Sequence, residues 1–252
     1  MKDPTRMGKN RTGMATAPRQ SERQKSNQGQ SPEMAGEALA NLRAAIALES
    51  DTVGTVPPPA SLKGAARNAM EMGLGRDPKA FLDKLGERLA FERTGTRLFD
   101  ALLAKHASGD SPVGMADAAT LQTFRDQERR HFDMVWENLA ALGADPTCET
   151  PAADLAGVKA KGLIAAITDP RATFCQALEA MLVAELTDNE SWRQLIDLAD
   201  GMGQVRMVES FQAALADEDI HLETIRRWVN GLVREEAGLE AETVAARGAD
   251  AV

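Results

Sequence analysis

Two tetrapeptides of the pattern Glu-x-x-His carry the residue types with the clearest chemistry in this chain. They span residues 128–131 and 218–221 and contain two of the three histidines. On a helix, residues i and i+3 lie on one face, so each tetrapeptide directs a carboxylate and an imidazole toward the same point. One such tetrapeptide would be a weak signal. Two of them, each with a further glutamate upstream at a similar distance, indicate a two-metal site inside a helical bundle.

Carboxylates also interrupt the apolar stripes of the four predicted long helices. The residues on these stripes are Glu92, Glu128, His131, Glu185, Glu218 and His221. A buried carboxylate without a partner is costly, so four glutamates and two imidazoles in one core layer need cations between them. Two divalent metal ions would neutralise the four carboxylates. The alternative is a set of exposed Glu/Arg pairs, but the repetition of the pattern at stripe positions in both halves argues against it.

Helix start and stop signals predict the elements that must position these residues. Four long helices are expected, from Asp77-Pro78 to about 106, from about 117 to 142, from Asp169-Pro170 to about 200, and from about 204 to 236. Asp-Pro supplies an N-cap followed by proline at the first helical position. Residues 143–169 are long enough to cross the bundle end to end, even with a short helix at about 154–167. The predicted fold is all-α, a four-helix bundle with one long crossover, plus N-terminal helices.

The composition divides the chain into four predicted segments. Residues 1–30 are polar and basic and are expected to form a disordered tail. Residues 31–76 are expected to form an N-terminal helical extension and linker, with helices at about 32–50 and 61–72. Residues 77–236 are the predicted bundle, and residues 237–252 are a predicted flexible C-terminal tail.

The repeated pattern Glu … Glu-x-x-His, over about residues 78–236, resembles the ferritin-like di-iron carboxylate family, which includes bacterioferritins and rubrerythrins. The stretch 85–98 also resembles bacterial ferritin-like domain proteins of undefined function. The resemblance implies roles for the six stripe residues. Terminal metal ligands would be Glu92 and Glu185, bridging ligands Glu128 and Glu218, and nitrogen ligands His131 and His221. The absence of tyrosine argues against a tyrosyl-radical role of the kind found in ribonucleotide reductase.

The mixed oxygen and nitrogen ligands suit two metal ions, with Fe as the first candidate and Mn or a mixed Fe/Mn pair as alternatives. The resemblance implies oxidation of Fe(II) by O2 or peroxide, or reduction of peroxide. Two other functions stay open. One is a metal-stabilised helical module without enzymatic activity, and the other is a di-iron oxygenase that acts on an organic substrate.

Residues near the predicted ligands have simpler interpretations. Asp188 lies one turn from Glu185 and could orient a histidine, or it could be a solvated or Arg-paired group. Trp192 and Trp228 are interpreted as core packing.

Composition sets the remaining expectations. A formal net charge of -9 argues against general nucleic-acid binding, and the chain lacks an apolar run that could form a transmembrane helix. The two cysteines have no Cys-x-x-Cys spacing, which favours buried thiols in a reducing compartment. We therefore expect a cytoplasmic protein, with O2 or peroxide as its partner, a homodimer as a candidate assembly, and neither a membrane nor a specific nucleic acid as a partner.

Overall fold

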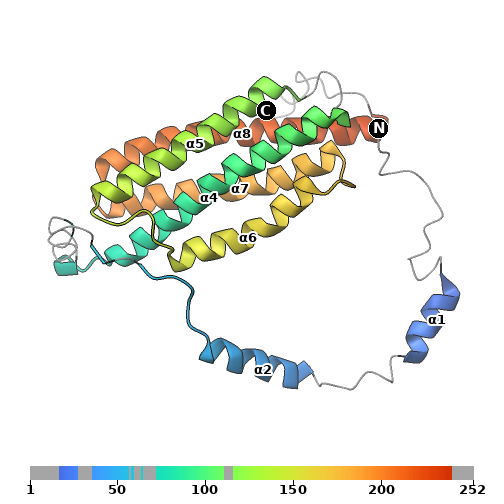
Figure 1. The fold of residues 1–252 in the computed structure, drawn as a ribbon, viewed down its shortest axis with the longest axis horizontal. Helices are drawn as coiled ribbons and strands as arrows, with labels where there is room; N and C mark the ends of the chain where they lie inside the picture. The colour runs from blue at the N-terminus through green and yellow to red at the C-terminus, as the bar shows by residue number, and fades with distance from the viewer. Residues whose placement is uncertain are drawn as a thin grey trace, which may run out of the picture. The chain divides into compact units, whose positions relative to one another are not determined.

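The computed structural model describes residues 17–27, 36–56, 58–59, 64, 72–110 and 116–239 (Figure 1). Within these ranges every regular element is a helix, which confirms the predicted all-α class. The chain forms two compact units, Asp3–Thr52 and Val53–Val252, the second joined by Met1–Lys2. The bounds predicted for the four segments stay a prediction.

The first unit contains helices α1 (Pro18–Asn27) and α2 (Gly36–Glu49). Helix α1 lies in the segment expected to be disordered, so the structure differs from the expectation there. Its Arg, Gln, Glu and Lys residues favour a helix even without an apolar face, and Pro18 occupies the first position, where its missing N–H costs nothing. The Ser21 hydroxyl donates to the Ala17 carbonyl across the first turn. Helix α2 falls inside the predicted range 32–50.

Helices α4 (Pro78–Lys105) and α5 (Ala118–Ala141) begin where the sequence predicts their starts. The Asp77 carboxylate accepts a hydrogen bond from the Lys79 N–H, and the Asp117 carboxylate accepts one from the Ala119 N–H. These bonds satisfy N–H groups that the first turn of a helix leaves without partners. Helix α4 runs into a short π-helix, η1 (His106–Asp110), which ends near Gly109 at φ 83.

Helix α6 (Pro151–Thr168) lies in the predicted crossover, and α7 (Phe174–Gly201) follows it. The prediction that α7 begins at Asp169-Pro170 is wrong, because Asp169 instead caps the C-terminus of α6 and binds Arg171. Helix α7 begins at Thr173, whose hydroxyl accepts from the Gln176 N–H while the Gln176 side chain accepts from the Thr173 N–H. This reciprocal capping box is a stronger start signal than Asp-Pro alone.

Helix α8 (Val205–Glu236) completes a bundle of two helical hairpins, α4–α5 and α7–α8. Helix α4 contacts α5 and α7, α7 contacts α8, and α5 contacts α8. Helix α6 packs on α4 and α7, on the outside of the bundle (Figure 1). The structure therefore confirms a four-helix bundle with one long crossover, and the crossover itself is mostly helical.

A polar layer divides the hydrophobic core of the bundle into two clusters. One cluster contains Phe99, Phe124, Met181 and Ile225, and the other contains Leu85, Val135, Trp192 and Phe211. Along α5, α7 and α8 the two clusters are separated by the residues predicted to bind metal, and on α4 they meet between Leu89 and Phe91, next to Glu92. Trp192 and Trp228 are buried in these clusters, as predicted.

Three smaller expectations meet the structure as follows. None of the helices in the described ranges has an apolar stretch long enough to span a lipid bilayer. Both cysteines are free thiols, but Cys148 is exposed while Cys175 is buried, so the expectation of two buried thiols is wrong for Cys148. Most of the predicted helix 61–72 and most of the predicted tail 237–252 lie outside the described residues.

Candidate metal centre

All six predicted ligands lie in the polar layer at the middle of the bundle. Helix α4 contributes one, α5 two, α7 one and α8 two, and each residue is at most 5% exposed. These residues are Glu92, Glu128, His131, Glu185, Glu218 and His221. The structure therefore brings together residues that are up to 129 positions apart in a sequence of 252, as the stripe pattern predicts.

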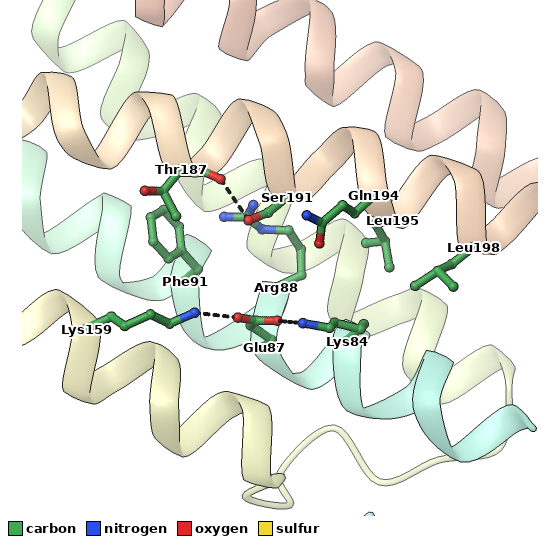
Figure 2. A pocket seen from close by; sticks show the side chains of 10 residues that line it. All are labelled: Lys84, Glu87, Arg88, Phe91, Lys159, Thr187, Ser191, Gln194, Leu195 and Leu198. Carbon is green, nitrogen blue, oxygen red and sulfur yellow. Dashed lines mark hydrogen bonds and ion pairs between the residues drawn. The ribbon is translucent and has the colours of Figure 1, made fainter.

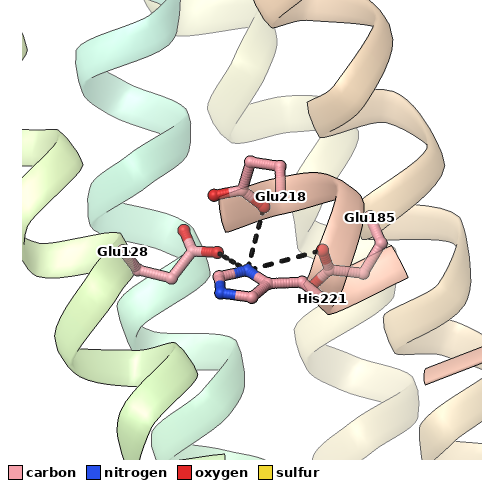
Figure 3. A group of neighbouring side chains, drawn as sticks. All are labelled: Glu128, Glu185, Glu218 and His221. Atoms are coloured by element: carbon pink, nitrogen blue, oxygen red, sulfur yellow. Dashed lines mark hydrogen bonds and ion pairs between the residues drawn. The ribbon is translucent and has the colours of Figure 1, made fainter. Parts of the chain in front are cut away.

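One half of the layer surrounds His221 (Figure 3). The His221 Nδ1 atom lies 3.0 Å from Glu218 Oε2, 3.6 Å from Glu128 Oε1 and 3.8 Å from Glu185 Oε2. Three carboxylates from three helices thus point toward a single imidazole nitrogen. The ring of Phe124 packs against the imidazole at a centroid distance of 4.1 Å and limits its rotation.

The other half surrounds His131 with the same chemistry. The His131 Nδ1 atom lies 2.9 Å from Glu218 Oε1 and 3.6 Å from Glu92 Oε2. The two imidazole rings are 6.5 Å apart. Because Glu218 presents one carboxylate oxygen to each histidine, it lies between the two halves. Glu128 also reaches both halves, because it has an oxygen near Glu185 and His221 and one near Glu92.

The far nitrogen of each imidazole contacts an acceptor on the opposite hairpin. His131 Nε2 lies 3.3 Å from Asp217 Oδ2, and His221 Nε2 lies 3.0 Å from Gln127 Oε1. In a neutral ring, an Nε2–H donated to each acceptor leaves the Nδ1 lone pair facing the carboxylates, where it could bind a metal ion. Gln127 and Asp217 each precede a predicted bridging glutamate, so this pair also follows the pseudo-symmetry of the site.

The electrostatics of the layer favour a bound cation. Burial raises the pKa of Glu128 and of Glu185 well above their usual range, and the nearby charge of Glu218 raises them further. Burial also opposes the charge on Glu218, but the two histidines outweigh it and lower its pKa to about 2. His131 shows the converse: burial disfavours its charge, while contacts with Glu218 and Glu92 raise its pKa to about 10.

The residues present fit a pair of metal ions. Several buried carboxylate oxygens in the layer have no hydrogen-bond partner, among them Glu92 Oε2, Glu128 Oε2 and Glu185 Oε2. A buried polar atom without a partner costs free energy, and a metal ion would satisfy these oxygens. Carboxylate oxygens with imidazole nitrogens form a ligand set suited to Fe or Mn. The layer is therefore a buried Glu/His cluster compatible with a di-metal site.

Gly95 makes room for one of these carboxylates. It lies on α4 almost one turn after Glu92, and a Cβ atom at this position would meet Glu128 Oε2 and lie 2.6 Å from Glu128 Cδ. Any larger residue would therefore push the Glu128 side chain out of its present position. Glycine in a helix interior lowers stability, and at Gly95 this cost is explained by the space that Glu128 needs.

Sequence reasoning missed Arg88, which is 2% exposed and lies in the same layer. Its Nε atom is 2.7 Å from Glu92 Oε1, and its Nη1 atom is 2.7 Å from Asp188 Oδ1. Asp188 is therefore a buried, Arg-paired group and contacts neither His ring at hydrogen-bond distance. The i,i+4 spacing of Arg88 and Glu92 was the available signal.

Arg88 also balances the charge of the layer. The layer contains five buried carboxylates, and the charge of Arg88 offsets that of Asp188, so four glutamates remain for two divalent cations. Asn189, also missed, joins α7 to α8 at this level, because its amide donates to the Glu185 and Glu218 carbonyls at 3.2 and 3.0 Å.

Comparison with known proteins gives one match. The family model of the ferritin-like domain matches residues 104–234, which is more than half of the chain. The matched region contains Glu128, His131, Glu185, Glu218 and His221, and it begins after Glu92 on α4. No curated protein and no solved structure matches the chain.

Proposed function

The chain belongs to the ferritin-like domain family, and on that premise we propose that its bundle binds two metal ions, with iron as the first candidate, and oxidises Fe(II) with O2 or peroxide or reduces peroxide. The observation that carries this proposal is the position of Glu218. Its two carboxylate oxygens face the Nδ1 atoms of two different histidines at 2.9 and 3.0 Å. A carboxylate shared in this way suits a bridge between two ions.

The six residues take the following proposed roles. Glu92 and His131 would hold one ion, Glu185 and His221 would hold the other, and Glu128 and Glu218 would contact both. A pair of bound redox metals would supply one-electron chemistry and Lewis acidity at neighbouring positions. With two Fe(II) ions bound, each would supply one electron, and hydrogen peroxide would take up two electrons and two protons to give two water molecules.

The rest of the chain orients these ligands and excludes water. Asp217 and Gln127 fix the two imidazole rings through their Nε2 atoms, and Asn189 fixes the backbone beside Glu185 and Glu218. The hydrophobic clusters above and below the layer keep bulk water from the carboxylates. The homodimer and the cytoplasmic location stay predictions from the sequence.

The test is an anaerobic titration of the metal-free protein with Fe(II), followed by exposure to air or to peroxide. We expect two ions per chain and their oxidation. Glu128→Ala should lose the pair, whereas Glu190→Ala, at an exposed position on α7, should bind as the wild type does. A stoichiometry far from two, or normal binding by Glu128→Ala, would refute the proposal. Two bound ions without a measurable oxidation rate would instead support a structural role.

A further inference from the structure

A small pocket opens on the side of the bundle where α4, α6 and α7 meet (Figure 2). Its wall includes Thr187, Ser191 and Gln194 of α7, with Arg88 and Phe91 of α4 at its inner end. Arg88 is the important residue here, because it both lines the pocket and contacts the predicted ligand Glu92 at 2.7 Å. One side chain therefore separates the pocket from the candidate metal centre.

The mouth of the pocket carries two ammonium groups and one carboxylate. Glu87 binds Lys84 at 2.6 Å and Lys159 at 2.7 Å, so it ties α4 to α6 across the opening (Figure 2). Arg88 at the inner end is paired with Glu92 and Asp188, so the two lysines and Glu87 leave one excess positive charge at the mouth. A divalent metal ion is repelled by such a surface, whereas a neutral molecule is not.

The inner end of the pocket has a hydrogen-bond donor to spare. Arg88 points its Nε and Nη1 atoms toward Glu92 and Asp188, but its buried Nη2 atom has no hydrogen-bond partner. The guanidinium is held in place by the rings of Phe91 and Trp192, at 4.7 and 5.0 Å. A polar molecule that reaches Arg88 would therefore find a fixed donor.

The size of the pocket restricts what it can hold. Its volume is about 20 Å³, which is close to the space that one water molecule needs. Hydrogen peroxide and O2, with two heavy atoms each, are near this limit, and a larger organic substrate is far above it. All six predicted ligands are buried, so a small reactant must reach them by passing between side chains.

We propose that this pocket is the binding site through which a small neutral oxidant, O2 or hydrogen peroxide, reaches the metal centre, and that Fe(II) reaches the centre by another path. The inference rests on the function proposed above and adds to it a separate route for each reactant. Arg88 is then a positioning residue, since its Nη2 atom donates to hydrogen peroxide at the inner end of the pocket while its other nitrogens hold Glu92 and Asp188.

The experiment separates metal binding from access of the oxidant. Ser191→Leu should fill the pocket from its wall, and Gln194→Trp should cover it from an exposed position. Ser210→Leu is the matched control, because Ser210 is also a half-buried helical serine whose hydroxyl donates to a preceding carbonyl, but it does not line the pocket. Each protein is loaded with two equivalents of Fe(II) without oxygen and then mixed rapidly with hydrogen peroxide or O2.

We expect all three variants to bind two Fe(II) ions with unchanged affinity. Oxidation should be slower by about tenfold in Ser191→Leu and in Gln194→Trp, and unchanged in Ser210→Leu. Normal oxidation rates in both pocket variants would overturn the inference while leaving the proposed function intact. A wild-type protein that fails to bind or oxidise the iron pair would overturn both. Slower Fe(II) binding in Gln194→Trp would also overturn it, because iron would then share the route.

Discussion

Replacing Arg88 with methionine should lower the free energy of unfolding of the metal-free protein by about 3–5 kcal/mol. Arg88 has its Nε and Nη1 atoms 2.7 Å from Glu92 and Asp188, and all three side chains are buried. Removing one partner of a buried ion pair leaves the other charge without compensation in a medium of low dielectric. Methionine has a similar length and keeps contact with Phe91 and Trp192, so the loss reports mainly the charge.

A second substitution tests this explanation. Asp188→Asn removes the charge that Arg88 offsets, so the double variant Arg88→Met/Asp188→Asn should regain about 1–3 kcal/mol relative to Arg88→Met alone. The matched control is Arg193→Met. Arg193 forms an exposed pair with Asp219 at 3.0 Å, and its loss should cost less than about 1 kcal/mol.

The assay is urea unfolding of the metal-free proteins, followed by the helical circular dichroism signal at neutral pH. Two results would refute the reasoning. One is an Arg88→Met protein that is as stable as the Arg193→Met control. The other is a double variant that is no more stable than Arg88→Met, since the cost would then come from packing and not from the unpaired carboxylate.

Two further predictions concern the ligands themselves. Gly95→Ala should displace the Glu128 carboxylate, lower stability by about 1–3 kcal/mol and abolish binding of the metal pair. The control Gly162→Ala, with open space around it, should stabilise the protein by up to about 1 kcal/mol. Thermal unfolding and metal titration check both variants. Metal affinity should rise with pH, because the raised pKa of His131, about 10, means that its proton must leave before a metal ion can bind. Calorimetry in buffers of different ionisation enthalpy should detect this proton release at neutral pH.

The raised pKa of His131 also fixes the sign of one stability effect in the metal-free protein. Its protonated ring stabilises the folded state fully below the unfolded value of 6.5, and this contribution is lost as pH rises from 6.5 toward 10. Stability without metal and affinity for metal should therefore change in opposite directions over this window. Normal metal binding by Gly95→Ala, or binding at neutral pH with no proton release, would contradict these expectations.

The stripes and caps of the sequence were enough to predict the bundle and the six clustered side chains. A helix fixes which residues share a face, so a glutamate at a stripe position must face the core whatever the partner helix is. Asp77 caps α4 as expected, because a cap is a local interaction, and α5 begins at Asp117 as expected. The predicted start of α7 was wrong, also for a local reason, because the Thr173–Gln176 capping box starts the helix after Asp169-Pro170.

The missed residues depend on contacts between helices. Arg88 has the spacing of an ordinary exposed i,i+4 pair with Glu92, and only the approach of Asp188 on α7 shows that it is buried. Gln127 and Asp217 lie beside ligands in the sequence, but their partners are histidines on another helix. The rotation of one helix against another decides such contacts, and periodicity within a single helix does not contain it.

The division of the core into two hydrophobic clusters makes the stability of the folded chain, and so its lifetime, depend on the supply of metal. Apolar packing stops at the ligand layer, so the two ends of the bundle are joined there by buried carboxylates whose charges Arg88 and His131 offset only in part. An ion that binds only the folded chain adds about 2.7 kcal/mol of stability at a free concentration of 100 times its Kd. A chain made during metal scarcity would unfold more often and be degraded sooner, so its abundance would report the metal available to it.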